Sequence, residues 1–262
     1  MHIHLDDLHR HGHSLIHHLD PRIKVVMAVL FILTVSLTPF GAFGAYVALL
    51  IIVLGAAVIA QIGVGFVLRR SVVALPFALA AITLPFTVPG APLVTLPIFG
   101  GLAISQEGAI RFVSILTKSW ISLQMAIVLV TVTSFPDLLW GLRSLHVPQP
   151  LIAIVGFMHR YLFVIADEVL RLLRARASRS GELDGLRSGG GLVWRGKVTG
   201  QMAGSLMIRS FERSEHIYNA MLARGYQGQI HTMTPSQLQM TDLIALGTTV
   251  ILLAIVLLLA WF

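Results

Sequence analysis

Long apolar blocks with almost no charge restrict the fold of this chain more than any other feature of its sequence. A helix needs about 20 mostly apolar residues to cross about 30 Å of hydrocarbon. Only 12% of the residues are charged, against about a quarter in ordinary soluble domains, and the mean hydropathy is +0.83. The sequence therefore predicts an all-α integral membrane protein with about five transmembrane helices, over 25–40, 42–61, 72–88, 109–133 and 243–262.

The positions of Lys and Arg predict how these spans are oriented, because basic residues accumulate on the cytoplasmic side of a membrane. Arg22 and Lys24 stand just before the first span, whereas the connections 38–44 and 89–105 contain no charge and are rich in Pro and Gly. We therefore expect a multi-pass protein of the inner (plasma) membrane. Its N-terminus is in the cytoplasm, and the two uncharged connections are outside.

The stretch 151–166 is apolar enough to suggest a further span, but the sequence after it is strongly basic. Twelve of the 19 basic residues fall between Arg143 and Arg224, and placing them outside would reverse the charge rule. We therefore expect 151–166 to pack against the spans without crossing. The predicted organisation is a His-rich cytoplasmic tail over 1–21, four transmembrane helices within 22–135, long cytoplasmic or interfacial coupling helices over 136–230, and a last transmembrane helix within 240–262.

Proline and glycine predict the helix boundaries within 136–230. A polar residue followed by Pro136 predicts a helix start, and Pro148 and Pro150 end that short helix. A long helix is expected from there to about Arg179, with Asp167 and Arg171 paired four residues apart. After a glycine-rich break, a second long helix is expected over 198–224. One of its faces carries apolar side chains at helical spacing: Met207, Phe211, Tyr218 and Leu222.

Each of these two long helices ends in an arginine between small residues. Small neighbours let another protein's backbone come close, and the planar guanidinium can bind a carboxylate or a pair of carbonyls with two hydrogen bonds. Such ends suit docking into a groove of a partner. The alternative is an ordinary helix end, where a cation and a Gly cap are favoured by the helix dipole. Both interpretations remain open for the candidate residues Ser178, Arg179, Ser180, Ala223, Arg224 and Gly225.

The pair resembles the two Ala-Arg-Gly signatures of the transmembrane (T) component of energy-coupling factor (ECF) transporters. The segments 19–24 (Leu-Asp-Pro-Arg-Ile-Lys), 133–136 (Thr-Ser-Phe-Pro) and 145–148 (Leu-His-Val-Pro) also resemble that family, in the same order. The similarity is closest to the cobalt-transport type, CbiQ. The first signature departs from the pattern because it is Ser-Arg-Ser, which leaves the close backbone approach at Ser180 in doubt.

The resemblance implies a mechanical role and not an enzyme. In this family the two signature helices insert into two ATPase (nucleotide-binding) subunits, and a separate small membrane subunit captures the substrate. ATP would be used by those partners and no cofactor would be bound by this chain, which contains no Gly-x-x-x-x-Gly-Lys-Ser/Thr phosphate loop. The implied cargo is Co²⁺, which links the chain to cobalamin biosynthesis, with nickel or a vitamin as the alternatives.

The N-terminus is rich in histidine, a good ligand for Co, Ni, Zn and Cu. Weak metal binding or a solvated tail without a role are both compatible with this pattern. Because the tail is expected inside, it could receive or buffer metal but could not capture an external ion. The candidate ligands are His2, His4, His9, His11, His13, His17 and His18.

Other classes of function find less support in the sequence. A self-sufficient secondary metal transporter would need ligands in the middle of the membrane, and no predicted span carries a carboxylate there. Arg111 and Lys118 lie in the fourth span, where Arg111 can reach the surface and Lys118 is expected to face another helix or a polar cavity. No metalloprotease or serine-hydrolase motif is present. The net charge of +7 fits the cytoplasmic loops of a membrane protein in the lipid bilayer, and we expect no nucleic-acid partner.

Overall fold

This computed structural model describes residues 14–74, 76, 79, 81–96, 102–179, 191–228 and 238–261. The chain divides into two compact units. We call residues 7–146 with 236–262 the membrane unit, and residues 147–235 with 1–6 the coupling unit. The chain thus passes from one unit to the other between His146 and Val147 and returns near residue 235.

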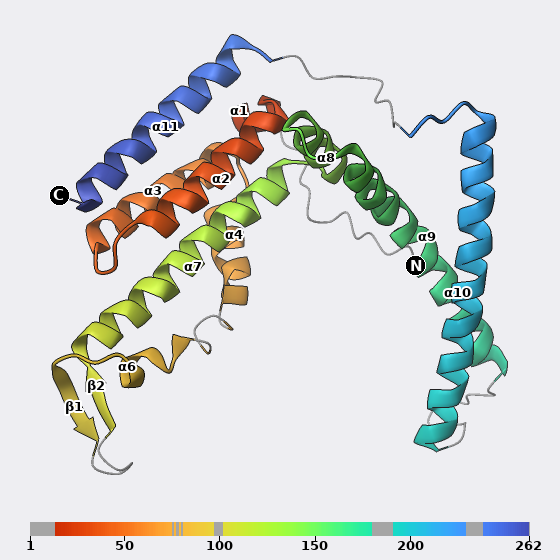
Figure 1. The fold of residues 1–262 in the computed structure, drawn as a ribbon, viewed down its shortest axis with the longest axis horizontal. Coiled ribbons are helices and arrows are strands. Elements are labelled where there is room, and N and C mark those ends of the chain that lie inside the picture. The colour runs from red at the N-terminus through yellow and green to blue at the C-terminus, as the bar shows by residue number, and fades with distance from the viewer. Residues whose placement is uncertain are drawn as a thin grey trace. The chain divides into compact units, whose positions relative to one another are not determined.

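Four helices form the body of the membrane unit and pack side by side (Figure 1). They are α2 (Pro21–Leu37), α3 (Phe43–Ile59), α7 (Gln106–Val132) and α11 (Met240–Trp261). The shorter elements are α1 (Leu15–His18), α4 (Val64–Arg70), the 3₁₀ turn η1 (Ser71–Ala74), α6 (Leu84–Thr87), β1 (Pro92–Leu96), β2 (Leu102–Ser105) and α8 (Phe135–Ser144). Four of the five predicted spans are therefore helices in the structure, and the prediction of an all-α membrane protein is confirmed.

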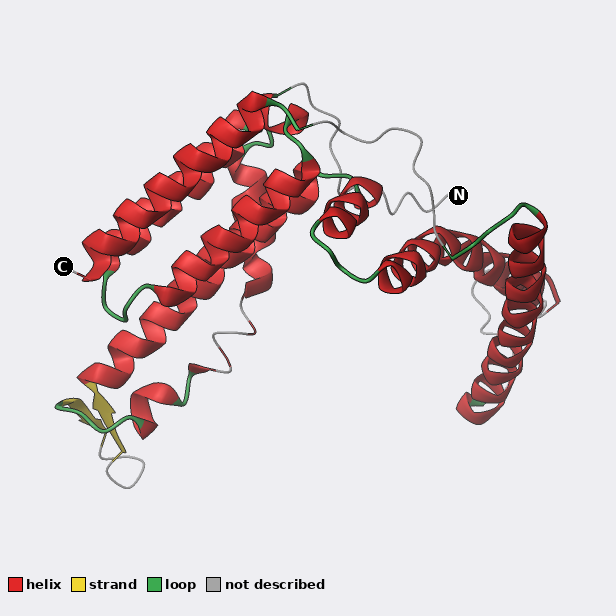
Figure 2. Cartoon of the chain, turned by 45° about the horizontal axis from the view of Figure 1, so that its top comes forward, coloured by secondary structure: helices red, strands yellow, loops and turns green. Residues whose placement is uncertain are grey.

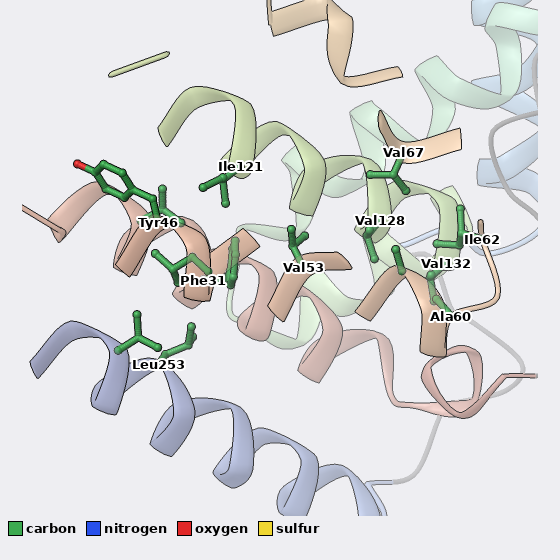
Figure 3. Close-up of a cluster of buried hydrophobic side chains, with 14 residues drawn as sticks. Phe31, Tyr46, Val53, Ala60, Ile62, Val67, Ile121, Val128, Val132 and Leu253 are labelled. Atoms are coloured by element: carbon green, nitrogen blue, oxygen red, sulfur yellow. The ribbon is translucent and has the colours of Figure 1, made fainter. Parts of the chain in front are cut away.

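The core of the membrane unit lies where these four helices meet (Figure 3). Phe31 of α2, Val53 of α3, Val128 of α7 and Leu253 of α11 belong to one buried apolar cluster. Many apolar side chains on the other faces of the same helices are exposed, as expected for helices whose solvent is lipid. Each of these helices therefore carries apolar side chains on the face toward the core and also on its outer faces.

The segment 72–88, predicted as the third span, differs from that prediction. Its described residues begin in η1 and end in the short helix α6. Pro76 and Pro85 fall within the segment, and proline removes a backbone donor and clashes with the preceding helical turn. The uncharged connection that follows also contains regular structure, because β1 and β2 form a short antiparallel hairpin in which Leu96 pairs with Leu102.

The coupling unit is built on two long helices, α9 (Gln149–Arg179) and α10 (Leu192–Ala223) (Figure 2). The described part of α9 reaches Arg179, so the predicted end there stays a prediction. α10 starts at Leu192, directly after Gly191 and six residues before the predicted start at 198. Among the described residues, α7, α9 and α11 are long and apolar enough to cross a membrane. Length and composition therefore do not decide whether α9 crosses, and its cytoplasmic or interfacial placement stays a prediction.

Candidate functional site

The two long helices of the coupling unit are joined by an ion pair at their crossing. Glu168 of α9 accepts a hydrogen bond from Arg209 of α10, with 2.9 Å between Oε1 and Nη1, and its other oxygen accepts one from Arg171. The Glu168 side chain is only 14% exposed. The expected pairing of Asp167 with Arg171 is wrong, because Glu168, three residues from Arg171, takes that place. Because Glu168 lies on the side of α9 that faces α10, its carboxylate binds both Arg171 and Arg209.

The ends of the two helices point away from each other. A groove of about 490 Å³ is lined by α9 from Ile154 to Glu168 and by α10 from Leu206 to Met221. α10 therefore runs antiparallel to α9 beyond the crossing. At 1.5 Å per residue, Arg179 lies about 16 Å beyond Glu168 along α9, and Arg224 lies about 22 Å beyond Arg209 along α10. The two candidate arginines thus stand on opposite sides of the crossing.

The end of α10 is a Schellman cap built on Gly225. The N–H of Gly225 donates to the carbonyl of Leu222 and the N–H of Tyr226 donates to that of Met221, each at 3.0 Å. Gly225 has φ +80°, a conformation that favours glycine. The ordinary helix cap considered from the sequence is therefore present. It does not use the side chain of Arg224, which is exposed and has no partner among the described residues.

The end of α9 presents a similar side chain in a different local setting. Arg179 is the last described residue of α9, and the hydroxyl of Ser178 donates to the carbonyl of Ala175 at 3.0 Å. Both residues are exposed, and the Arg179 guanidinium has no ion-pair partner within the described part of the chain. Ser180 lies outside the described residues. The structure thus presents two exposed arginines at helix ends.

Apolar side chains on α10 are exposed beside these ends. Met207, Phe211, Tyr218 and Leu222, predicted to share one face, are each about half exposed or more. On α9, Ile154 and Met158 are also exposed. Exposed apolar side chains that share one face of a helix are typical of an interaction surface. The sequence indicated this face through its helical spacing.

The family-like segment 19–24 is hydrogen-bonded to the start of α11 in the membrane unit. Asp20 caps α2 by accepting from the N–H of Arg22 at 2.9 Å, and its own N–H donates to Asp242 of α11 at 3.1 Å. The Lys24 ammonium donates to the carbonyl of His17 at 2.9 Å. Asp242 also accepts from the N–H of Gln239. These bonds tie the starts of α2 and α11 together, a pairing across the whole chain that no local pattern could indicate.

The helix α8 is held against the start of α2. Ser134 caps α8 by accepting from the N–H of Asp137, and the Arg22 guanidinium lies 4.2 Å from the centre of the Trp140 ring. A Cβ on Gly141 would stand 3.3 Å from the backbone of Pro21, so glycine permits this close approach. The third segment, 145–148, follows at once: His146 has φ +66° and marks the passage to the coupling unit. Trp140 was not predicted to contribute.

The charged residues of α7 have different surroundings. The Lys118 ammonium donates to the carbonyls of Thr38 and Ser36, the latter at 3.2 Å, and lies 4.6 Å from the centre of the Phe40 ring. The prediction that Lys118 faces another helix is confirmed, since these groups form the end of α2. Lys118 thus caps the C-terminal end of α2. Arg111 is exposed.

The candidate metal ligands in the tail fall mostly outside the described residues. His2, His4, His9, His11 and His13 lie there, and only His17 and His18 belong to α1. The ring of His17 is hydrogen-bonded to Ser14, with 2.6 Å between Nδ1 and Oγ. Within the described ranges no three His, Asp or Glu side chains gather as a metal site. The tail's metal binding stays a prediction.

The fold and these helix ends define a helical integral membrane protein with two long helices that end in exposed arginines. Residues 12–235 match the family model described as "CbiQ: Cobalt transport protein". The chain belongs to this family, which confirms the resemblance to the T component of ECF transporters. The matched region contains both arginine signatures and all three family-like segments.

Three relatives illustrate the range of the family. The ECF transporter transmembrane protein EcfT of Ruminiclostridium cellulolyticum is 27% identical over 262 residues, which cover 95% of this chain and 94% of the relative. The cobalt transport protein CbiQ of Rhodobacter capsulatus is 26% identical over 158 residues, 60% of this chain and 62% of the relative. The nickel permease LarQ of Lactiplantibacillus plantarum is 29% identical over 119 residues, 45% and 41% of the two chains. These relatives are membrane components of transporters and not enzymes.

Proposed function

We propose that this T component transmits ATP-driven movement from two ATPase subunits to a separate membrane subunit that captures the substrate. Arg179 and Arg224 would each bind one ATPase subunit, together with their small neighbours Ser178, Ser180, Ala223 and Gly225. The chain itself would bind neither ATP nor another cofactor. It would lie in the inner membrane with its N-terminus in the cytoplasm and its coupling unit in the cytoplasm or at the membrane interface.

The observation that carries this proposal is the placement of the two arginines. They end two helices that cross at Glu168 and Arg209 and diverge on opposite sides of the crossing. Neither has a partner among the described residues, and an exposed guanidinium at a helix end is free to bind a carboxylate or carbonyl pair in another protein. Two separated ends suit two separate subunits, one for each arginine.

The exposed apolar face of α10 supports a contact with a further protein. Its half-exposed side chains, Met207, Phe211, Tyr218 and Leu222, lie along the same helix that ends at Arg224. A surface of this kind is suited to the small membrane subunit, because apolar contacts are compatible with a partner that is itself embedded in lipid. A movement of α10 at the ATPase would then change its contact with the capture subunit.

We propose Co²⁺ as the cargo, on the basis of the family and of the CbiQ relative. Nickel is the second candidate, because the nickel permease LarQ is also a relative. Neither ion needs a site in this chain, since capture would belong to another subunit. Cobalt would link the chain to cobalamin biosynthesis.

Purification of this chain from its own membranes tests the composition directly. A tagged chain should bring down two ATPase chains and one small membrane protein in fixed ratio. Uptake of radioactive Co²⁺ by vesicles that contain the complex should then depend on internal ATP and should be reduced less by excess Ni²⁺ than by excess unlabelled Co²⁺. A chain that purifies alone and moves metal without ATP would contradict the coupling role, whereas a stronger effect of Ni²⁺ would change only the cargo.

A further inference from the structure

The first turn of α10 carries three adjacent apolar side chains that the described residues leave uncovered. Leu192 is 90% exposed and Val193 is 87% exposed, the two highest values among the described large apolar side chains. Trp194 follows at 47%. Membrane spans expose apolar side chains because lipid surrounds them, but α10 is not among the described helices that are apolar enough to cross a membrane. Adjacent exposed apolar side chains outside a span are typical of an interaction surface.

The surroundings of this turn are basic. Arg195 directly follows Trp194 and is exposed. Because α10 runs antiparallel to α9 at their crossing, its start lies on the same side of the crossing as the last turns of α9, where Arg174 is exposed. No acidic residue occurs over 169–179 or over 191–211. The described surface on this side of the crossing is therefore positively charged and is complementary to an anionic partner.

The residue types of this turn indicate the surface of a bilayer as that partner. Tryptophan is enriched where a membrane meets water, and helical segments with Trp and Leu beside basic residues bind at the level of the lipid head groups. The cytoplasmic leaflet also carries a negative surface potential. Of the four tryptophans of the chain, Trp194 is the one in the coupling unit. Because the chain is a membrane protein, an anionic lipid surface is always close to it.

We propose that the first turn of α10 binds the surface of an anionic bilayer. Leu192, Val193 and Trp194 would be buried among the lipid head groups, and Arg195 would bind their phosphates. This contact would hold the start of α10 at the membrane surface. Arg224, about 48 Å away along the helix at 1.5 Å per residue, would stay available to another protein. The inference does not depend on the proposed transport function.

Spin labels on the full chain test the proposal without any partner protein. Val193→Cys, in this cysteine-free chain, is labelled with a nitroxide and reconstituted in phosphatidylcholine vesicles with or without phosphatidylglycerol. Electron paramagnetic resonance then measures collisions with oxygen, which concentrates in lipid, and with a nickel chelate dissolved in water. With phosphatidylglycerol present, the label at 193 should meet more oxygen and less nickel than a label at Asn219→Cys, an exposed position on the same helix.

Two variants test the charge and the apolar contact separately. Arg195→Gln should shift the label at 193 towards water by about fivefold in the ratio of bound to free turn, and only in vesicles that contain phosphatidylglycerol. Arg195→Lys is the matched control, because it keeps the charge and should retain the contact. Trp194→Ser should shift the label towards water in both kinds of vesicle. All of these side chains are exposed, so the fold should be unchanged, which thermal unfolding checks.

Two results would overturn the proposal. Equal access of the nickel chelate to 193 and 219 in vesicles with phosphatidylglycerol would show that the turn stays in water. Protection of 193 from both oxygen and nickel would show that protein covers it, from this chain or from a second copy. An unchanged label in Arg195→Gln would refute the part of the proposal that assigns the phosphates to Arg195.

Discussion

Reversal of the charge at Arg179 and Arg224 tests docking separately from folding, because neither arginine has a partner among the described residues. Both are exposed and neither forms an ion pair among the described residues. Surface substitutions of this kind change stability by about 0.5 kcal/mol or less. Removal of one partner from a buried charged pair in an interface costs about 2–5 kcal/mol. Each Arg→Glu change should therefore weaken assembly by about thirtyfold to several thousandfold and leave the fold intact.

The assay compares thermal unfolding of the purified chain with retention of the ATPase subunits during purification. Arg179→Glu should weaken one ATPase contact and Arg224→Glu the other, and the double variant should lose both subunits and transport. Arg→Lys should be intermediate, because an ammonium keeps the charge but not the planar pair of donors. Lys197→Glu is a matched control, since it makes the same change in charge on an exposed residue near the start of α10.

Gly225 provides a second test of the same helix end. A Cβ at this position would meet no atom of the described residues within 4 Å, so a clash with them cannot explain an effect of Gly225→Ala. Its φ of +80° makes the change cost about 1–2 kcal/mol through backbone strain alone. Gly225→Ala should thus lower both stability and assembly, whereas Arg224→Glu should lower assembly only. Normal assembly and transport in the double Arg→Glu variant would refute docking and leave these motifs as ordinary helix ends.

Four other predictions concern the rest of the chain. Single cysteines in this cysteine-free protein should react with an impermeant thiol reagent from outside at Ala91 but not at Asn219. Asp242→Asn should lower the free energy of unfolding by about 1–3 kcal/mol, measured by thermal unfolding, because the carboxylate accepts two backbone N–H groups. Gln124→Met should stabilise the chain in the same assay, since this fully buried amide has no partner among the described residues. Deletion of 2–13 should reduce Co²⁺ binding in calorimetry and leave ATP-dependent transport intact.

Each of these four has a clear contrary outcome. Labelling of Asn219→Cys in intact cells would reverse the predicted orientation. An unchanged stability of Asp242→Asn would mean that the tie between α2 and α11 contributes little. Loss of stability in Gln124→Met would show that the amide has a partner in the membrane. Loss of metal-stimulated ATP hydrolysis on deletion of the tail, with assembly preserved, would make the tail part of the transport cycle.

The predictable parts of the fold are those that depend on the composition of a single segment. The helices α2, α3, α7 and α11 coincide with apolar blocks, and α8 begins directly after the polar residue Ser134 with Pro136 in its first turn, as predicted. The segment 72–88 shows the limit of this reasoning. The segment is as apolar as the other predicted spans, but its hydropathy does not record that proline lacks a backbone N–H donor. Pro76 and Pro85 therefore interrupt the helix that the apolar content predicted.

The features of the site that lie within one segment could be predicted from the sequence. The contacts between segments that are far apart in the sequence could not. The arginines at the helix ends could be found from their small neighbours. By contrast, the bond of Asp20 with Asp242 and that of Glu168 with Arg209 join residues far apart in the sequence. For Glu168 the choice between two adjacent acidic residues depended on which of them faces α10. The i, i+4 spacing rule considers a single helix. It therefore predicted that Asp167 pairs with Arg171 and took no account of the contact with α10.

The contacts around α8 indicate where the membrane unit ends. α8 is fixed to α2 by the Arg22–Trp140 contact and by the close approach at Gly141, so it belongs to the membrane unit as a rigid element. α9 begins only a few residues later, and between them His146 has φ +66°, which is uncommon outside glycine. The family-like segment 145–148 therefore lies at the junction of the two units, between the end of α8 and the start of α9.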